Sequence, residues 1–361
     1  MSSKSDQILG MRNIKDLRRL GNTGLSVPPI IYGTSFMGNL YHELPAETKL
    51  EIMKKWFDVS ESAPMIDTAG KYGAGLALEV IGKGLKELGI DKDDIIISNK
   101  LGWYRIPLIT DEPTFESGAW VNLKYDAVQK ISYSEILECW EQGCELLGRY
   151  YKPQVVSVHD PDEYLFAATD PIDRAKRLNN VISAYKALFE LKAKGEVKAV
   201  GIGAKDWLTI KELYEYVKFD WVMFANKLTI YHHPPEIVTF IEKIYNEGVG
   251  IINSAIFNGG FLTGGDFFDY RKIDSQLIED QKLLDWREKF YAICYDYHIL
   301  PGDACLKFAF AMPQISAIAL NPSKPSRISR NVDLLKTNLP GEFWNELKRQ
   351  GIIHNQFSYL P

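Results

Sequence analysis

Four residues with acid–base side chains stand at or just after the ends of short apolar segments. Asp67 and His159 are the last residues of two such segments, Tyr72 follows the first of them closely, and Lys100 follows a third. Short apolar segments form buried strands, and the carboxyl ends of parallel strands meet at one rim. We therefore expect these four side chains to lie together.

The four side chains form a set suited to moving a proton. A tyrosine titrates near pH 10 in water, so Tyr72 needs its ionised form favoured if it is to exchange a proton near neutrality. The Lys100 ammonium would do this by Coulomb attraction, and the Asp67 carboxylate would keep that lysine charged and oriented. A neutral His159 would hydrogen-bond the substrate oxygen. Because the set contains no redox centre, a dissociable cofactor must carry the hydride.

The elements that would position these residues alternate between short apolar runs and longer amphipathic segments. Eight runs are predicted as strands: Pro29–Tyr32, Met65–Asp67, Ile95–Asn99, Val155–His159, Ala199–Gly203, Trp221–Ala225, Gly250–Asn253 and Ile315–Leu320. Eight segments are predicted as helices: Ala46–Glu61, Leu76–Leu88, Tyr133–Leu147, Ala175–Lys194, Leu208–Val217, Glu236–Glu247, Leu283–His298 and Ser326–Leu335. Strands separated by helices run parallel, with right-handed crossovers.

Eight such units predict an α/β fold in which the strands close into a (β/α)₈ TIM barrel. An open, doubly wound sheet is the competing topology. Leu17–Leu20 and Leu25–Val27 flank Gly21–Gly24, which predicts an N-terminal β-hairpin that closes the barrel floor. No linker rich in Pro or Ser divides the chain, so residues 1–361 are predicted to form a single domain.

Two stretches, 102–130 and 258–275, are longer than ordinary connections and leave the carboxyl ends of predicted strands. Loops of this length without structure of their own are usually functional, so we expect both at the active site. The first stretch is expected to wall the substrate pocket with aromatic side chains: Trp103, Tyr104, Phe115 and Trp120.

Composition excludes several classes of partner. The formal net charge of −5 and the absence of clustered Lys and Arg argue against nucleic acid. The polar N-terminus and the lack of a long apolar segment argue against a signal peptide or membrane span and favour a cytoplasmic location. Cys139, Cys144, Cys294 and Cys305 are widely spaced and predicted to be reduced packing residues. The adjacent His232 and His233 have no third ligand within reach along the sequence, so no metal site is expected.

The residues singled out above also match a known pattern. The segment Ile66-Asp67-Thr68-Ala69-x-x-Tyr72-Gly73, the hairpin Leu20-Gly21-x-Thr23-Gly24-Leu25, and Lys100 and His159 at their strand ends together resemble the aldo-keto reductase family along the whole chain. The resemblance implies a catalytic tetrad of Asp67, Tyr72, Lys100 and His159. In that tetrad Tyr72 is the acid or base, and Lys100 lowers its pKa.

Three further segments resemble one particular group within this family. Residues 159–163, 201–207 and 253–262 are similar to the D-threo-aldose 1-dehydrogenase and L-fucose dehydrogenase group, which oxidises the anomeric carbon of free sugars to lactones. This implies an aldose substrate, with hydroxyl partners among Trp103, Tyr104 and Asp160. Two alternatives stay open: a general NADPH-dependent reductase of aldehydes or ketones, and a cofactor-binding regulatory subunit with little turnover.

The same resemblance implies where a nicotinamide dinucleotide binds. The implied contacts are Gly203, Ala204, Asn226, Ser254, Phe257, Asn258, Gly260, Leu262, Ser326, Arg327 and Asn331. NADP is favoured over NAD because Arg327 and Lys324 can pair with a 2′-phosphate. The sequence departs from the family's usual pattern after the fifth predicted strand. Gly203, Ala204 and Lys205 stand there in place of the Ser-Asn pair that usually holds the nicotinamide carboxamide.

Overall fold

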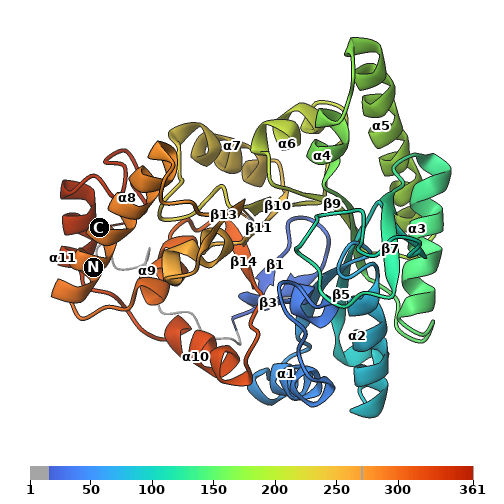
Figure 1. The fold of residues 1–361 in the computed structure, drawn as a ribbon, viewed down its shortest axis with the longest axis horizontal. Coiled ribbons are helices and arrows are strands. Elements are labelled where there is room, and N and C mark those ends of the chain that lie inside the picture. Colours follow the sequence, from blue (N-terminus) through green and yellow to red (C-terminus); the bar gives the residue numbers. More distant parts are fainter. Residues whose placement is uncertain (1–15, 270, 361) are drawn as a thin grey trace.

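A computed structural model describes residues 16–269 and 271–360. Eight parallel strands form a closed barrel at the centre of the molecule (Figure 1). They are β3 (Ile30–Gly33), β4 (Met65–Ala69), β5 (Ile96–Leu101), β8 (Val155–His159), β9 (Ala199–Ala204), β10 (Trp221–Ala225), β11 (Gly250–Ser254) and β14 (Ile315–Leu320). Each strand pairs with the next along the chain, and β14 pairs with β3 to close the ring. The predicted TIM barrel is confirmed, and the open sheet is wrong.

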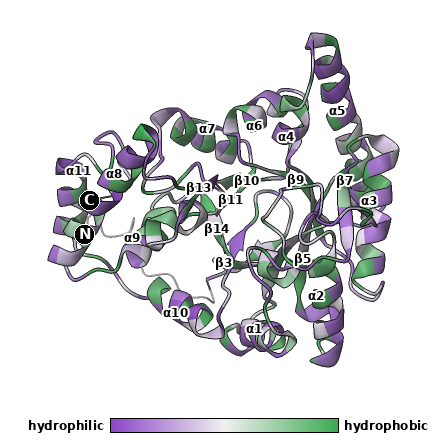
Figure 2. Cartoon of the chain, in the orientation of Figure 1, coloured by the Kyte–Doolittle hydropathy of each residue, from purple (hydrophilic) through white to green (hydrophobic). Residues whose placement is uncertain are grey.

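Helices surround the barrel on its outside (Figure 1). The eight predicted helices are present as α1 (Ala46–Val59), α2 (Leu76–Glu87), α3 (Tyr133–Leu146), α5 (Pro171–Ala193), α6 (Trp207–Tyr214), α7 (Pro235–Asn246), α8 (Ile278–Asp296) and α10 (Pro325–Leu335). Figure 2 shows α2, α3 and α5 carrying both hydrophilic and hydrophobic residues, as one-sided burial requires. The sequence did not predict α4 (Pro161–Phe166), α9 (Pro301–Ala309), α11 (Gly341–Arg349) or the 3-10 turns η1 (Ser35–Gly38), η2 (Lys92–Asp94) and η3 (Asn258–Thr263).

The barrel strands are apolar along their length because both of their faces are buried. Successive side chains of a strand point to opposite faces. In β8, Val155 belongs to the cluster inside the barrel, whereas Val156 and Val158 belong to the core between barrel and helices. All three are fully buried. A continuous apolar run therefore predicts this kind of strand well.

The N-terminal hairpin closes one end of the barrel, as predicted. It consists of β1 (Arg18–Arg19) and β2 (Ser26–Val27), which pair antiparallel. Leu20 is fully buried and packs with the side chains inside the barrel. Gly21 has a φ of 56°, and a Cβ on it would lie 2.4 Å from the carbonyl oxygen of Gly248. Only glycine allows this close approach of the hairpin to the barrel floor.

The two long stretches contain regular structure, so the expectation of structureless loops is wrong. In 102–130, β6 (Trp103–Pro107) and β7 (Tyr125–Gln129) form an antiparallel ribbon. In 258–275, η3 precedes the short antiparallel pair β12 (Phe267–Phe268) and β13 (Arg271–Lys272). The residues of β6 and β7 include the aromatic and branched types that favour strands, and they pair with each other instead of staying irregular.

The cysteines are free and buried, in agreement with the prediction. Burial raises the pKa of the thiols of Cys139, Cys144 and Cys294 to about 12, so these sulfurs stay protonated and unreactive. Within residues 16–269 and 271–360, no helix is both long enough and apolar enough to cross a membrane.

One buried histidine joins the C-terminal segment to the barrel domain's core. The Nδ1 atom of His233 lies 3.0 Å from the carbonyl oxygen of Thr229, and its Nε2 atom accepts a hydrogen bond from the backbone N–H of His354 at 2.9 Å. The rings of Phe308 and Phe357 pack against the imidazole. Burial lowers the pKa of His233 to about 4. The folded protein therefore needs this imidazole neutral.

This burial predicts a loss of stability in mild acid. The unfolded chain takes up a proton at His233 below about pH 6.5, whereas the folded protein resists it down to about pH 4, so stability falls as the pH falls between these values. Urea unfolding at pH 7 and pH 5 should show the wild type losing about 2 kcal/mol more than His233→Gln. Equal losses in the two proteins would contradict this assignment.

Candidate active site

A cavity of about 620 Å³ opens at the carboxyl ends of the barrel strands. All eight strands contribute to its wall, through Gly33, Asp67, Lys100, His159, Ala204, Ala225, Ser254 and Leu320. The cavity extends from Tyr72 to Arg327 and Asn331 on α10. The rim therefore gathers the predicted acid–base residues at one end and basic and amide side chains at the other.

Lys100 and Asp67 form a buried ion pair across adjacent strands. The Lys100 ammonium contacts the Asp67 carboxylate directly, and both side chains are 4% exposed. Ser98 donates a second hydrogen bond to Asp67 at 3.1 Å. The Lys100 nitrogen lies 4.9 Å from the centre of the Tyr72 ring. The structure thus brings the predicted lysine, aspartate and tyrosine together.

The backbone turn that carries Tyr72 packs tightly against η1. Gly73 has a φ of 62°, and a Cβ on it would lie 2.3 Å from the carbonyl oxygen of Gly38. Larger residues are excluded here both by space and by backbone conformation. The Tyr72 ring lies 5.7 Å from the His159 ring, edge on, and 5.9 Å from Trp120. The phenol is therefore fixed on several sides.

The pKa of Tyr72 is shifted in the direction opposite to the one expected from Lys100. Burial raises it well above 10, and the carboxylates of Asp67, Asp160 and Glu116 raise it further, while Lys71 lowers it. Burial and these carboxylates therefore outweigh the lowering effect of the neighbouring ammonium, so the phenol of the protein alone is less acidic than a free tyrosine, whereas a more acidic phenol was expected. The physical reason is that Lys100 is already paired with Asp67 and the phenol has lost its contact with water.

His159 is neutral, as expected. Burial lowers its pKa well below 6.5, and the ammonium groups of Lys100, Lys71 and Lys205 act in the same direction, against the carboxylate of Asp160. The Nε2 atom lies 3.5 Å from an oxygen of Asp160. The Nδ1 atom is buried and has no hydrogen-bond partner within the described part of the chain.

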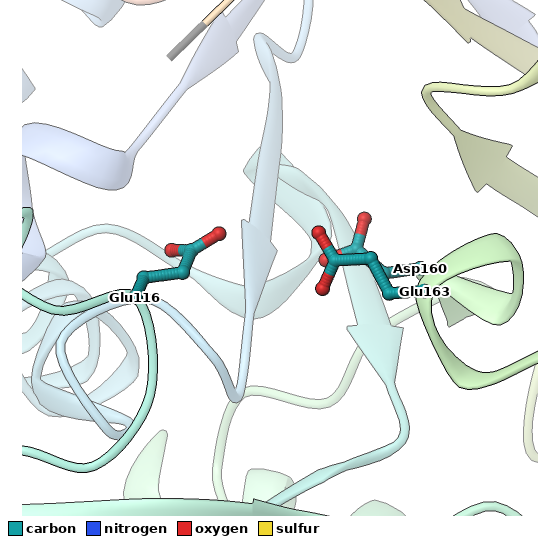
Figure 3. Close-up of side chains that lie close together, drawn as sticks. All are labelled: Glu116, Asp160 and Glu163. Carbon is teal, nitrogen blue, oxygen red and sulfur yellow. The ribbon is translucent and has the colours of Figure 1, made fainter. Parts of the chain in front are cut away.

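A group of charged side chains beside His159 was not predicted. The Lys71 ammonium is 2% exposed and contacts Asp160 at 2.6 Å, Glu116 at 2.7 Å and Glu163 at 3.0 Å. Lys205 contacts Glu163 at 2.6 Å. We call these five residues the lysine–carboxylate cluster. Figure 3 shows Glu116 reaching in from a different side than Asp160 and Glu163.

The three carboxylates of this cluster have oxygen atoms within 4.8 Å of one another, a spacing that a metal ion also uses. Here the Lys71 ammonium contacts all three, so a cation of the chain itself balances them. A signal was present in the sequence, because Lys71 and Asp160 directly neighbour Tyr72 and His159 at the rim. Glu116 lies too far along the chain for such an inference.

The cofactor residues expected from the resemblance divide into two groups. Seven line the cavity: Gly203, Ala204, Ser254, Phe257, Gly260, Arg327 and Asn331. The other four do not: Asn226, Asn258, Leu262 and Ser326. Leu262 is fully buried in the core, and the Asn258 amide donates to Asp269 at 2.9 Å, so both are turned away from the cavity. Asn226 is buried and keeps an unpaired side-chain oxygen within the described residues.

Of the expected substrate contacts, only Asp160 lines the cavity. Trp103 does not line the cavity, and the centre of its ring lies 4.7 Å from the Lys71 ammonium. Tyr104 lies on the ribbon with its ring 4.4 Å from Lys130. The expectation that 102–130 walls the pocket is therefore wrong, because its aromatic side chains are used to bury Lys71 and to support Tyr72. The wall near the phenol comes instead from Phe36, Leu40 and Tyr41.

Several other lining residues were missed. Some follow strands whose ends were predicted correctly, and the rule that placed the tetrad would have found them: Thr34, Ser35, Asn321 and Pro322. Others come from the unpredicted start of α9: Leu300, Pro301, Gly302 and Asp303. Lys205 and Arg330 also line the cavity.

The cavity residues fit a dinucleotide. In η3, Gly259 and Gly260 adopt φ values of 73° and 99°, and a Cβ on Gly260 would meet nothing within 4 Å. The backbone is thus open to close approach by a bound group. No carboxylate within residues 16–269 and 271–360 forms an ion pair with Arg327, which leaves its charge available to a phosphate.

Comparison with known proteins agrees with this geometry. The model of the aldo/keto reductase family matches residues 29–351. The chain is 25% identical to pyridoxal 4-dehydrogenase of Microbacterium luteolum, over 93% of this chain and 97% of that protein. It is 22% identical to D-threo-aldose 1-dehydrogenase of a Pseudomonas species, over 91% and 96% respectively.

Among solved structures, glycerol dehydrogenase of Gluconobacter oxydans has the same fold, with a TM-score of 0.65, 16% identity, and coverage of 96% of this chain and 99% of that one. The family match, the barrel and the convergence of the four strand-end residues lead to one conclusion. This chain belongs to the aldo/keto reductase family and is an NAD(P)-dependent oxidoreductase.

Proposed function

We propose that Tyr72 is the proton-transferring residue of this oxidoreductase and that Asp67, Lys100 and His159 complete its catalytic tetrad. The observation that carries the proposal is their convergence. Lys100 contacts Asp67 and lies 4.9 Å from the Tyr72 ring, and His159 lies against the same ring. All four line one end of a single cavity.

Each side chain has a distinct role in the proposal. The nicotinamide, when bound, accepts or supplies the hydride. Tyr72 takes the proton from the substrate hydroxyl in oxidation and returns it in reduction. Asp67 holds Lys100 against the phenol, and the ammonium stabilises negative charge that forms on the Tyr72 oxygen. A neutral His159 donates a hydrogen bond that orients the substrate oxygen.

The dinucleotide would lie between Tyr72 and the beginning of α10. Ser254 and Gly203 line the cavity beside the tetrad, and Gly260 offers open backbone between the two ends. Arg327 and Asn331 would hold the adenosine end, where the helix N-terminus also favours negative charge. The uncommitted Arg327 guanidinium favours NADP over NAD.

We propose a free aldose as the substrate, oxidised at its anomeric hydroxyl to a lactone. Polar and charged groups line the cavity beside the phenol, including His159, Asp160 and Lys205, and these suit a molecule with several hydroxyls. The similarity to an aldose dehydrogenase along nearly the whole chain supports the same choice.

A second candidate is reduction of aldehydes or ketones. Burial keeps Tyr72 protonated, and a protonated phenol is the form that donates to a carbonyl oxygen. The apolar side chains of Phe36 and Leu40 also line the cavity and pack in one cluster with Tyr72. The first observation favours the reductive direction, and the second favours a substrate that is less polar than a sugar.

The first prediction concerns Tyr72. Because its pKa is raised, alcohol oxidation by the wild type should increase with pH between pH 7 and 9, as the phenolate becomes more populated. Tyr72→Phe should lower kcat by roughly 10²- to 10⁴-fold and remove that pH dependence. Tyr214→Phe, which removes a phenol bonded to Glu247 away from the cavity, is the matched control. Undiminished turnover by Tyr72→Phe would refute the proposed role.

The second prediction concerns Arg327. Arg327→Leu should raise the Kd of NADP roughly 10- to 100-fold and leave that of NAD nearly unchanged, because it removes one charge-assisted pair with the 2′-phosphate. Cofactor titration followed by tryptophan fluorescence measures both. Arg349→Leu, on α11 and paired with Glu346, serves as control. An equal loss for the two cofactors would show that Arg327 does not read the 2′-phosphate.

The third prediction separates the two substrate classes. Initial rates are measured for a panel of free aldoses, including L-fucose and D-threo-aldoses, and for pyridoxal and aromatic aldehydes, each with NAD(H) and NADP(H). The aldose proposal expects oxidation of sugars with lactone as product. Rapid reduction of aromatic aldehydes with no turnover of any sugar would select the reductase instead.

A further inference from the structure

We propose that the lysine–carboxylate cluster is a positioning device for His159, in which Asp160 fixes the imidazole tautomer while Lys71 and Lys205 keep the ring from being protonated. This inference rests on the proposed function only in giving His159 the task of donating to the substrate oxygen. The cluster residues are not needed to touch substrate for the device to work.

The Asp160 carboxylate lies beside one ring nitrogen of His159. One of its oxygens lies 3.5 Å from Nε2 of His159 and 2.6 Å from the Lys71 nitrogen. Asp160 itself is buried and adopts a left-handed backbone conformation, with φ at 50°, at the beginning of α4. A carboxylate beside a ring nitrogen repels its lone pair and stabilises an N–H there. Asp160 therefore favours the tautomer with the proton on Nε2.

The surroundings of the other ring nitrogen, Nδ1, also bear on the tautomer. In most buried histidines the hydrogen bond of one nitrogen decides which tautomer forms. The Nδ1 atom of His159 is buried without a partner in the described part of the chain, so no bond on that side fixes the proton. Within the described residues, the decision falls to the group near Nε2, which is Asp160.

The charges around His159 decide whether the ring stays neutral. A carboxylate this close to an imidazole also favours the doubly protonated cation, which is the wrong form for a neutral donor. Lys71 and Lys205 oppose that effect from the cluster, and Lys100 opposes it from β5. The Tyr72 ring also lies against the imidazole, and Asp67 is paired with Lys100. The pKa of His159 is lowered as a result, with burial as the largest cause.

The stretch 102–130 supplies part of the lysine–carboxylate cluster. It brings Glu116 to Lys71, with the oxygen and nitrogen 2.7 Å apart. The indole of Trp120, in the same excursion, donates to the other oxygen of Glu116 at 2.8 Å. A buried ammonium is stable only when carboxylates surround it well. The stretch 102–130 thus completes the lysine–carboxylate cluster through Glu116, and its Trp120 ring packs near the Tyr72 ring.

The test reads His159 directly by NMR. Histidine is labelled with ¹⁵N in the full-length protein, and the long-range proton–nitrogen spectrum distinguishes the tautomers and the cation. His159→Gln assigns the signal. The wild type should show a neutral ring with its proton on Nε2 down to pH 5.5. Asp160→Asn should shift the ring toward a mixture of the two tautomers.

Lys71→Met tests the second half of the device. Its His159 should titrate at least one pH unit higher than in the wild type, and the acid limb of kcat/KM should move up by the same amount. Lys71→Arg should restore both. Lys192→Met, which breaks a lysine–carboxylate pair with Asp220 away from the cavity, should change neither and controls for general destabilisation.

The inference is overturned if Asp160→Asn keeps the wild-type tautomer, or if Lys71→Met leaves the His159 titration where it was. Each variant tests one part of the proposal. If one variant fails to fold, the result for the other remains conclusive. The spectra do not depend on substrate. A protein that shows the predicted tautomer but keeps full turnover in Tyr72→Phe would refute the proposed function and leave the positioning device intact.

Discussion

The active-site end of this barrel depends on ion pairs between side chains that are shielded from water. Lys100, Lys71 and Asp160 are each at most 4% exposed, and an unpaired charge at such a depth is strongly unfavourable. The fold resolves this by placing opposite charges at the ends of nearby strands: Asp67 on β4 faces Lys100 on the adjacent β5, and Asp160 after β8 faces Lys71 after β4, with β5 between those two strands. Because each partner comes from a different strand end, the parallel order β4-β5-β8 in the barrel brings them into contact.

The barrel itself could be read from the sequence because each of its strands is buried on both faces. A run such as Trp221–Ala225 is apolar throughout and has the same bounds in the structure. The short helix α11 was missed although its buried residues Phe343, Trp344 and Leu347 have the spacing of one helix face and Pro340 marks its beginning. With only nine residues, it offers that spacing over little more than one turn. Helix α5 begins at Pro171, capped by Asp170, which the periodicity alone did not reveal.

The position of the site was predictable, and its electrostatics were not. Strand ends placed Tyr72 and His159 at the rim, and the structure agrees. The pKa shift of Tyr72 depends on how much water the phenol retains and on whether Lys100 is already paired, and neither follows from residue types along a chain. Residue types alone likewise do not indicate which way the aromatic side chains of 102–130 point. Trp103 and Tyr104 lie behind the rim because the ribbon of β6 and β7 turns them there.

The last pairing of the barrel joins β14 to β3, elements that begin at residues 315 and 30. A barrel that lacks β14 has two open sheet edges, at β3 and at β11, whose backbone groups are free to pair with other chains. The ring closes only through a contact between segments that lie far apart in the chain, a kind of contact that forms slowly during folding. The pocket is also finished only at that moment, since Gly33 and Leu320 lie on the two sides of the closing seam.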